Sequence, residues 1–340
     1  MPMNIGDAIT PALTHTSRVL FRPFALRKWL AMGLVSMLAG VGGGGNGHSN
    51  WPTDKSGDMD DIGRSAGAWI MEHLALIVVA AILLFAVSLV FAWLGSVFKF
   101  VYLNQITRNP TAIREPFVRF IGAGTSYFLW EIVFSLVVTL AVVVLIALPV
   151  VLAFIAETSL VVRIIAVAWA VIVGLAIIVF ASVTQIFARD FVLSTMFARG
   201  VKVMQAWRTV IAIIRANAGQ SVLYLLLLMV ISLVSTIGTF IALAFVGLAF
   251  LIPGGVLAVI GWAIWAASGQ HWSPVLIGYA ATMGLALVLA FSYTLVCALQ
   301  PFLVFRRAYA LVVLGQADPS LATIPIPPAT SPRPMPETGA

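Results

Sequence analysis

The chain has 340 residues, of which 61% are hydrophobic and 9% are charged. Soluble domains carry about 25% charged residues, so this composition excludes soluble enzymes, soluble nucleic-acid-binding proteins and disordered chains. The formal net charge is +7. The basic residues of the chain flank apolar runs. This pattern indicates that they bind anionic lipid headgroups rather than nucleic acid.

Apolar stretches recur along the chain, and five of them meet the length of about 20 residues that a membrane span needs. The five are residues 70–98, 126–154, 160–187, 221–252 and 275–305. Residues 29–41 are shorter and fit a span, a re-entrant helix or the apolar region of a signal peptide. Residues 256–268 are also short. They follow Pro253-Gly254-Gly255, where we expect a surface turn.

The positions of Lys and Arg favour six spans with both termini in the cytoplasm. If residues 29–41 cross the membrane and residues 256–268 do not, one side receives every basic residue except Lys55, Arg64 and Arg163. Lys and Arg stay on the cytoplasmic side of such proteins. We therefore expect an all-α, multi-pass helical bundle in the cell inner membrane. Its oligomeric state is open, and a homo-oligomer is one form it could take.

Three basic amphipathic segments each precede an apolar span, which predicts three units that begin near residues 9, 111 and 201. Each segment places apolar residues on one helical face and basic residues on the other. Such helices suit the membrane–water interface. The alternative is that these are the ordinary basic loops of a multi-pass protein. The candidate headgroup-binding residues are Arg18, Arg22, Arg114, Arg119, Arg208 and Arg215.

Two segments outside the spans have distinct compositions. Residues 42–69 are glycine-rich and then acidic, which predicts a flexible extracytoplasmic loop. Residues 316–340 contain many prolines and predict a disordered cytoplasmic tail. Residues 1–315 are then a single integral membrane domain.

A few polar residues lie within or near the predicted spans. Glu131 is inside an apolar stretch, where an isolated carboxylate is costly. It is either a proton or cation relay, or a residue at the interface that pairs with Arg119 or another cytoplasmic Arg. Gln185 and Gln300 could line a polar path with it, or could serve as helix caps and interhelical hydrogen-bond partners.

No catalytic or metal-binding motif stands out in the chain. The His residues have no metal-ligand spacing, and neither a P-loop nor a G-x-S-x-G elbow occurs. The single cysteine, Cys297, cannot form an intrachain disulfide. We therefore expect no cofactor and no enzymatic activity.

Three stretches of mixed basic, aromatic and apolar residues stand out near the ends of the predicted spans. They are Arg22-Pro23-Phe24 with Arg27-Lys28-Trp29, Arg189-Asp190-Phe191-Val192 with Met196, Gly200 and Ala206-Trp207-Arg208, and Pro301-Phe302 with Phe305-Arg306, Tyr309-Ala310-Leu311 and Leu314-Gly315. Together they resemble uncharacterised bacterial six-span membrane proteins with a domain of unknown function. The layout is also similar to the membrane domain attached to some glycerophosphodiester phosphodiesterases. That resemblance implies a six-helix membrane fold and supplies no catalytic residues.

Three functions are compatible with these features. The first is a non-enzymatic membrane protein that organises envelope or lipid components. The second is a small-solute or ion transporter that uses Glu131 and the glutamines. The third, a lipid-modifying enzyme, has the least support, because no cluster of His or Asp residues faces a membrane surface.

Overall fold

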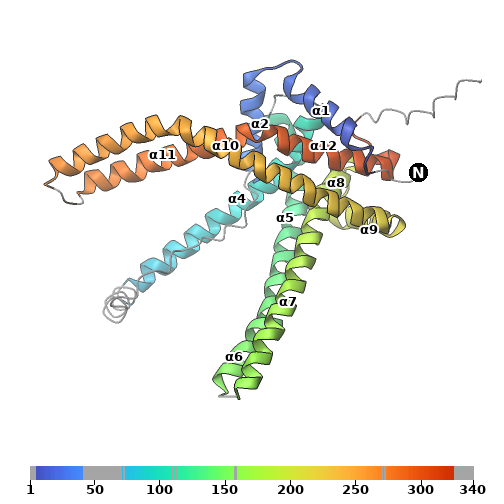
Figure 1. The fold of residues 1–340 in the computed structure, drawn as a ribbon, viewed down its shortest axis with the longest axis horizontal. Helices are drawn as coiled ribbons and strands as arrows, with labels where there is room; N and C mark the ends of the chain where they lie inside the picture. Colours follow the sequence, from blue (N-terminus) through green and yellow to red (C-terminus); the bar gives the residue numbers. More distant parts are fainter. Residues whose placement is uncertain are drawn as a thin grey trace, which may run out of the picture.

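A computed structural model describes residues 5–40, 71, 73–108, 111, 113–156, 159–269, 271 and 273–324. This part of the chain is helical throughout its regular structure and contains no strand. Figure 1 shows a central mass of short helices from which longer helices extend as three arms. We call the central mass the hub. The predicted loop 42–69 lies outside the described residues.

The hub contains the short helices and one end of each long helix. Its short helices are α1 (Ile9–Phe21), α2 (Leu26–Leu38), α8 (Leu193–Arg199), α9 (Val203–Ala216) and α12 (Gln300–Ala317). The first arm is α4 (Leu74–Arg108). The second pairs α5 (Arg114–Val142), η1 (Val143–Ala147) and α6 (Leu148–Ile155) with α7 (Leu160–Phe187), and the third pairs α10 (Ala218–Ala267) with α11 (Pro274–Ala298).

The arms are formed by the long apolar helices of the chain. Five helical segments, one each beginning at α4, α5, α7, α10 and α11, are long and apolar enough to cross a membrane, and at most 6% of their most apolar windows is buried. A sixth span over residues 29–41 is not confirmed. The helix at that place, α2, has 13 residues, or about 20 Å, which is shorter than the hydrocarbon core of about 30 Å.

The third arm differs from the sequence prediction in two ways. The prediction of a surface turn at Pro253-Gly254-Gly255 is wrong, because these residues lie inside α10, a continuous helix of 50 residues. Residues 256–268 pair with α11, and the Tyr279 hydroxyl donates to the Leu257 carbonyl at 2.8 Å. The predicted span 275–305 is also divided, since α11 ends at Ala298 and α12 begins at Gln300.

A proline in the second arm explains a local change of helix type. Pro149 has no N–H to donate to the carbonyl of Leu145, four residues earlier. The chain forms the π-helix η1 at this place. The Trp169 indole N–H of α7 donates to the Leu145 carbonyl at 3.0 Å. The indole thereby supplies a donor to a carbonyl whose regular helical donor is missing at Pro149, on an exposed apolar arm.

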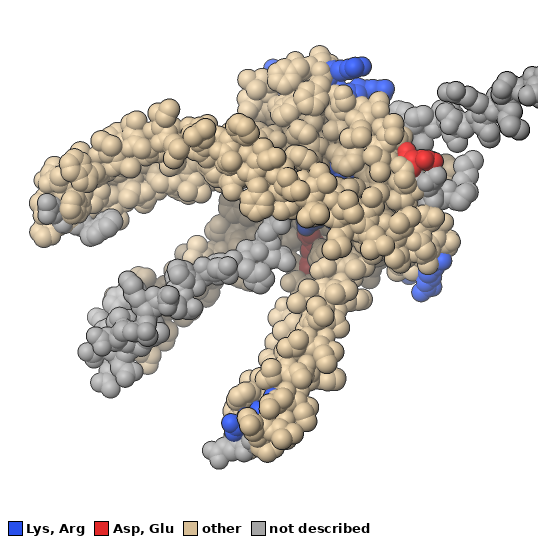
Figure 2. All heavy atoms as spheres, viewed as in Figure 1, with Lys and Arg blue, Asp and Glu red and all other residues tan. Residues whose placement is uncertain are grey.

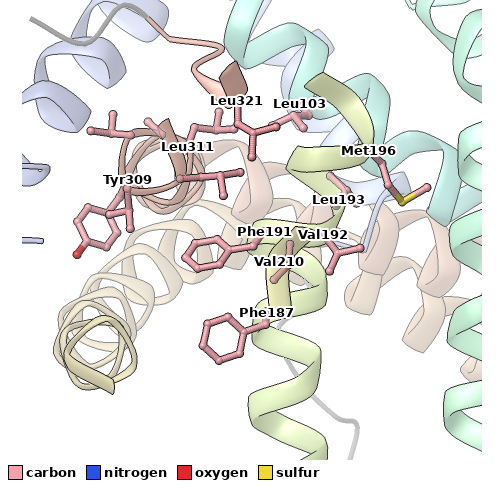
Figure 3. Close-up of a cluster of buried hydrophobic side chains, with 14 of the residues drawn as sticks. Leu103, Phe187, Phe191, Val192, Leu193, Met196, Val210, Tyr309, Leu311 and Leu321 are labelled. Atoms are coloured by element: carbon pink, nitrogen blue, oxygen red, sulfur yellow. The ribbon is translucent and has the colours of Figure 1, made fainter. Parts of the chain in front are cut away.

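Most of the described buried residues lie in the hub. In Figure 3, Phe187, Phe191 and Leu193 of the α7–α8 region lie near Tyr309 and Leu311 of α12, and Val210 of α9 lies among them. Helix α12 is buried continuously from Arg307 to Gly315. Such burial requires an element covered on all sides, and α12 is covered because elements from several parts of the chain contact it.

Close packing of α4 on α5 positions the base of two arms. Gly124 of α5 lies against Val97 of α4, and a Cβ atom built at Gly124 would be 2.7 Å from the Val97 Cα atom. Only glycine therefore permits this approach. Phe100 of α4 contacts Phe120 and Tyr127 on the same face of α5, at ring-centroid distances of 5.9 and 6.2 Å.

The three predicted amphipathic segments have different outcomes. In α1, the apolar stripe buries Ala12, Val19 and Leu20 in the hub. The second segment is not a separate helix, because α5 continues without a break from Arg114 into its arm. The third segment is α9, which buries Val203, Ala206 and Val210. Protein therefore covers much of the apolar stripe of α1, whereas Met204 and Ile211 of the α9 stripe stay 68% and 40% exposed.

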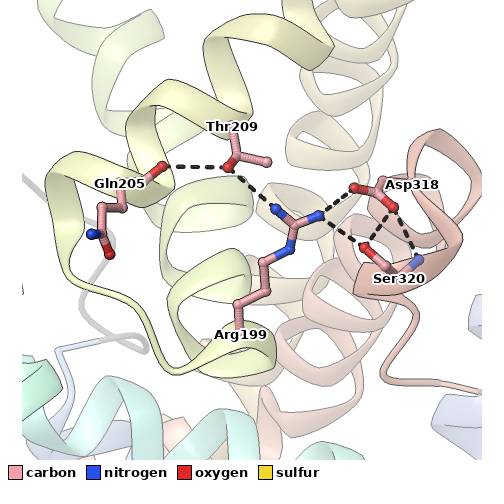
Figure 4. Close-up of polar contacts among 5 residues, drawn as sticks. All are labelled: Arg199, Gln205, Thr209, Asp318 and Ser320. Atoms are coloured by element: carbon pink, nitrogen blue, oxygen red, sulfur yellow. Dashed lines mark hydrogen bonds and ion pairs between the residues drawn. The ribbon is translucent and has the colours of Figure 1, made fainter.

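The chain after α12 folds back onto the hub. Arg199 donates to the Asp318 Oδ2 atom at 2.7 Å and to the Ser320 hydroxyl at 2.8 Å (Figure 4). Leu321 and Ile324 are buried in the hub core. The prediction of disorder from residue 316 is therefore wrong as far as Ile324, and residues 325–340 lie outside the described residues.

Candidate functional site

A buried acid–base pair lies where the second and third arms meet the hub. Asp190 accepts a hydrogen bond from Arg307 Nη1 at 3.3 Å, and the two side chains are 1% and 5% exposed. The Tyr224 hydroxyl of α10 donates to the second Asp190 oxygen at 3.1 Å. Arg306 lies 3.8 Å from that oxygen. Residues from the α7–α8 region, α10 and α12 therefore converge on one carboxylate.

The backbone around Asp190 is itself unusual. Residues Ala188–Val192 form the π-helix η2 between α7 and α8. Arg307 Nη1 also donates to the Arg189 carbonyl at 2.5 Å. A π-helical segment disturbs the regular backbone ladder, and here a buried guanidinium supplies a donor to it. Arg307 thus contacts both the side chain of Asp190 and the backbone beside it.

The environment of Arg307 is dominated by burial. Burial lowers the pKa of the Arg307 guanidinium, while the Asp190 carboxylate opposes this change. Arg keeps its charge in proteins. The pair therefore joins a guanidinium to a carboxyl group in an apolar interior. Such a pair is costly to separate once it is formed.

A second polar group lies at the base of the first two arms. Lys99 of α4 forms an ion pair with Glu131 of α5 at 2.5 Å, and Ser96 donates to the other Glu131 oxygen at 2.8 Å. The Lys99 ammonium also lies 5.1 Å from the centre of the Tyr127 ring. One of the two alternatives for Glu131 was a pair with Arg119 or another cytoplasmic Arg. The structure instead pairs Glu131 with a lysine, Lys99 of the neighbouring helix α4.

Gln300 belongs to a third polar group, between α2, α4 and α12. It is 0% exposed, donates to the Ser36 hydroxyl at 2.6 Å and accepts from the Tyr102 hydroxyl at 3.3 Å. Gln185 is half-buried on α7. Among the described residues, the structure joins neither Glu131 nor Gln185 to Gln300 by a hydrogen bond. The predicted path through all three is not assembled.

The six candidate headgroup-binding arginines are all exposed. They extend from α1, α5 and α9 and from the turn that follows α1. In Figure 2, blue side chains gather on the hub and at the tip of the α6–α7 hairpin, while the arms between are tan. The structure therefore separates two sets of charge, an exposed basic set and a buried paired set.

The buried group of Asp190, Arg307 and Tyr224 was not selected as a site from the sequence. Asp190 and Arg306 do lie in the stretches that carry the family resemblance, and these two stretches meet in the hub. A signal was available in Asp190 itself, because it is an acidic residue within a long apolar region. Its pairing with a residue 117 positions away could not be read from local pattern.

Metal binding finds no support in the described part of the chain, which brings together no group of three His, Cys, Asp or Glu side chains that could hold an ion. The polar groups present are paired carboxylates, cations, hydroxyls and amides. Their arrangement holds helices together and places charges at the arm bases.

Comparison with known proteins identifies a family and no individual relative. No curated protein and no solved structure matches the chain. The family match covers residues 3–324, and so includes the hub, every described helix and the segment held by Arg199. The chain belongs to the family of unknown function DUF7544.

Proposed function

We propose that the chain is a non-enzymatic multi-pass protein of the cell inner membrane whose hub lies at the cytoplasmic face and organises lipid or envelope components. The observation that carries this proposal is the division of the molecule into exposed apolar arms and a hub with exposed arginines. Apolar arms suit the acyl region, and arginines suit the layer of anionic headgroups.

The lengths of the arms support this placement. In α4, full burial begins at Ser96, which leaves residues 74–95 as an apolar segment without a fully buried residue. These residues extend about 33 Å at 1.5 Å per residue, close to the hydrocarbon thickness of about 30 Å. The hub then begins where the hydrocarbon ends.

A labelling experiment tests the placement of hub and arms. In a Cys297→Ser background, Lys202→Cys places a thiol on the hub and Ser159→Cys places one at the tip of the second arm; both positions are exposed. A membrane-impermeant thiol reagent added to intact spheroplasts should label Ser159→Cys and leave Lys202→Cys unlabelled until the cells are lysed. The opposite pattern contradicts the proposal.

A lipid experiment tests the role of the exposed arginines. We expect the full chain in nanodiscs to unfold at a higher temperature in phosphatidylglycerol than in phosphatidylcholine. Replacing the six arginines with Gln should reduce this difference by more than half. An unchanged difference argues against headgroup contact by these residues.

Transport is a second candidate, favoured by the Lys99–Glu131 pair at the arm bases. Proton flux into liposomes that contain the full chain and a trapped pH-sensitive dye tests it. A flux that disappears in Glu131→Gln but persists in Glu115→Gln, an exposed position on the same helix, supports transport. No flux above that of empty liposomes argues against proton transport.

A further inference from the structure

An apolar groove lies between α1, α10 and α12, away from the buried ion pair. Its volume is about 530 Å³. Leu13 and Phe21 of α1, Val230 and Val234 of α10, and Phe302 of α12 are among the residues that line it. The hydroxyl of Thr16, also in the lining, already donates to the Ala12 carbonyl at 2.7 Å. The groove thus presents mainly hydrocarbon.

The position of the groove connects the hub with the third arm. Leu228 of α10 is buried in the hub, whereas Val230 and Val234 on the groove are 55% and 54% exposed. The lining extends from residue 227 to 235 of α10 and from residue 9 to 21 of α1. These lengths correspond to about 12 and 18 Å. An acyl chain that fills one leaflet of hydrocarbon is about 15 Å long, so the groove is long enough to hold an acyl chain.

Two basic residues follow residues of α1 that line this apolar groove. Arg18 in the last turn of α1 and Arg22 just after it are next in the chain to Ser17 and Phe21, which line the groove. Both arginines are exposed, and neither forms an ion pair with an acidic side chain of the described residues. Nearby, burial lowers the pKa of His15, and Arg18 acts in the same direction. The arginines therefore carry the positive charge at this end.

The helix ends at this place are compatible with an anion. Phe21 at the C-terminal end of α1 and Pro301 at the N-terminal end of α12 line the same groove. The Tyr309 hydroxyl of α12 bonds to the Ile5 carbonyl near the other end of α1, so the two helices are antiparallel. The positive end of the α12 dipole thus offsets the negative end of α1. Within the described part of the chain, no acidic side chain forms an ion pair with Arg18 or Arg22.

We propose that this groove binds an acyl chain of one anionic phospholipid, whose phosphate is held by Arg18 and Arg22. The apolar walls accommodate the chain, and the two cations select a negatively charged headgroup. The inference rests on the proposed function, because it needs the hub to lie at the level of the headgroups. It goes further by naming one site, one lipid class and the residues that select it.

Native mass spectrometry of the full chain in detergent, with added phosphatidylglycerol or phosphatidylcholine, tests the proposal. We expect one retained phosphatidylglycerol per chain. Arg18→Gln/Arg22→Gln should lower its retention by about tenfold or more, since each cation near a headgroup contributes substantially. Arg208→Gln/Arg215→Gln on α9 is the matched control and should change retention less than twofold.

Filling the groove gives an independent test. Leu13→Trp places a large ring in the groove and should lower retention by about tenfold, whereas Leu83→Trp, at an exposed position on α4, should not. Val234→Trp repeats the test from α10 if Leu13→Trp does not fold, as judged by its unfolding temperature.

Three results overturn the site. Equal retention of phosphatidylcholine shows that the headgroup is not selected. An equal effect of the α9 control shows that anionic lipid binds the hub without a defined site, which leaves the proposed function intact. A dimer in place of a lipid-bound chain shows that a second copy covers the groove. Loss of any preference for anionic lipid in both this experiment and the nanodiscs contradicts the proposed function as well.

Discussion

The buried pair of Asp190 and Arg307 gives the most direct prediction about stability. Arg307→Ala leaves Asp190, which is 0% exposed, with the Tyr224 hydroxyl at 3.1 Å and with Arg306 at 3.8 Å. Removing one partner of a buried ion pair costs about 3–5 kcal/mol, because the other charge stays in the apolar interior. Since Arg306 compensates in part, we expect a loss near the lower end, about 3 kcal/mol.

The free energy of unfolding can be followed by tryptophan fluorescence in a denaturant titration of the full chain in detergent. Arg199→Ala is the matched control, because it removes an Arg from an ion pair whose side chains are 37% and 28% exposed. Such a pair contributes about 0–1 kcal/mol.

A double variant separates the charge effect from packing. Asp190→Leu/Arg307→Met leaves no unpaired charge, so most of the stability lost in Arg307→Ala should return. Similar, small losses for Arg307→Ala and Arg199→Ala would refute the reasoning, because they would mean that the pair is solvated. If the double variant is as unstable as Arg307→Ala, the loss of stability comes from the changed side-chain shape rather than from an unpaired charge.

Three further predictions concern packing, the arm backbone and pH. Gly124→Ala should lower the free energy of unfolding by about 1–3 kcal/mol by pushing α5 away from the α4 backbone. Gly122→Ala, with open space around it, should be neutral or stabilising by up to about 1 kcal/mol. Trp169→Phe should lower the free energy of unfolding in bicelles by about 1–2 kcal/mol, because it removes the indole donor to a carbonyl of η1. Trp262→Phe, at an exposed position, should lower it less. Equal losses contradict this explanation. Hydrogen bonds from Ser320 hold the pKa of Asp318 below its ordinary value of 3.8. The stabilisation by Asp318 is thus present above pH 3.8 and lost as pH falls through the lower, folded pKa. We therefore expect Asp318→Asn to lower the unfolding temperature at about pH 7. This difference from the unchanged chain should disappear in acid.

The apolar arms could be predicted because hydropathy is a property of consecutive residues. A run such as residues 160–187 is long enough to span whatever surrounds it, and the structure makes it α7 with the same bounds. The exposure of Arg208 and Arg215 was also predictable, since helical periodicity places them opposite the buried stripe of α9.

Helix breaks were predicted less well, because proline acts through its surroundings. Pro253 lies within a continuous α10, while Pro149 accompanies a π-helix whose carbonyl is satisfied from α7. The sequence shows at which positions a proline removes a backbone N–H donor. Whether a neighbouring helix replaces the lost hydrogen bond depends on which helix is packed there.

The sequence by itself determined that the chain has five runs long and apolar enough to span a membrane, with its cations gathered around a few short segments. Only the tertiary structure decided that Glu131 pairs with Lys99 and that Asp190 pairs with Arg307 across 117 positions. The physical reason is that the length and hydropathy of an apolar run depend on consecutive residues, whereas the pairing of a buried charge depends on which distant residues pack against it. Asp190 meets Arg307 where α12 packs against η2, and no local pattern in either segment specifies the contact.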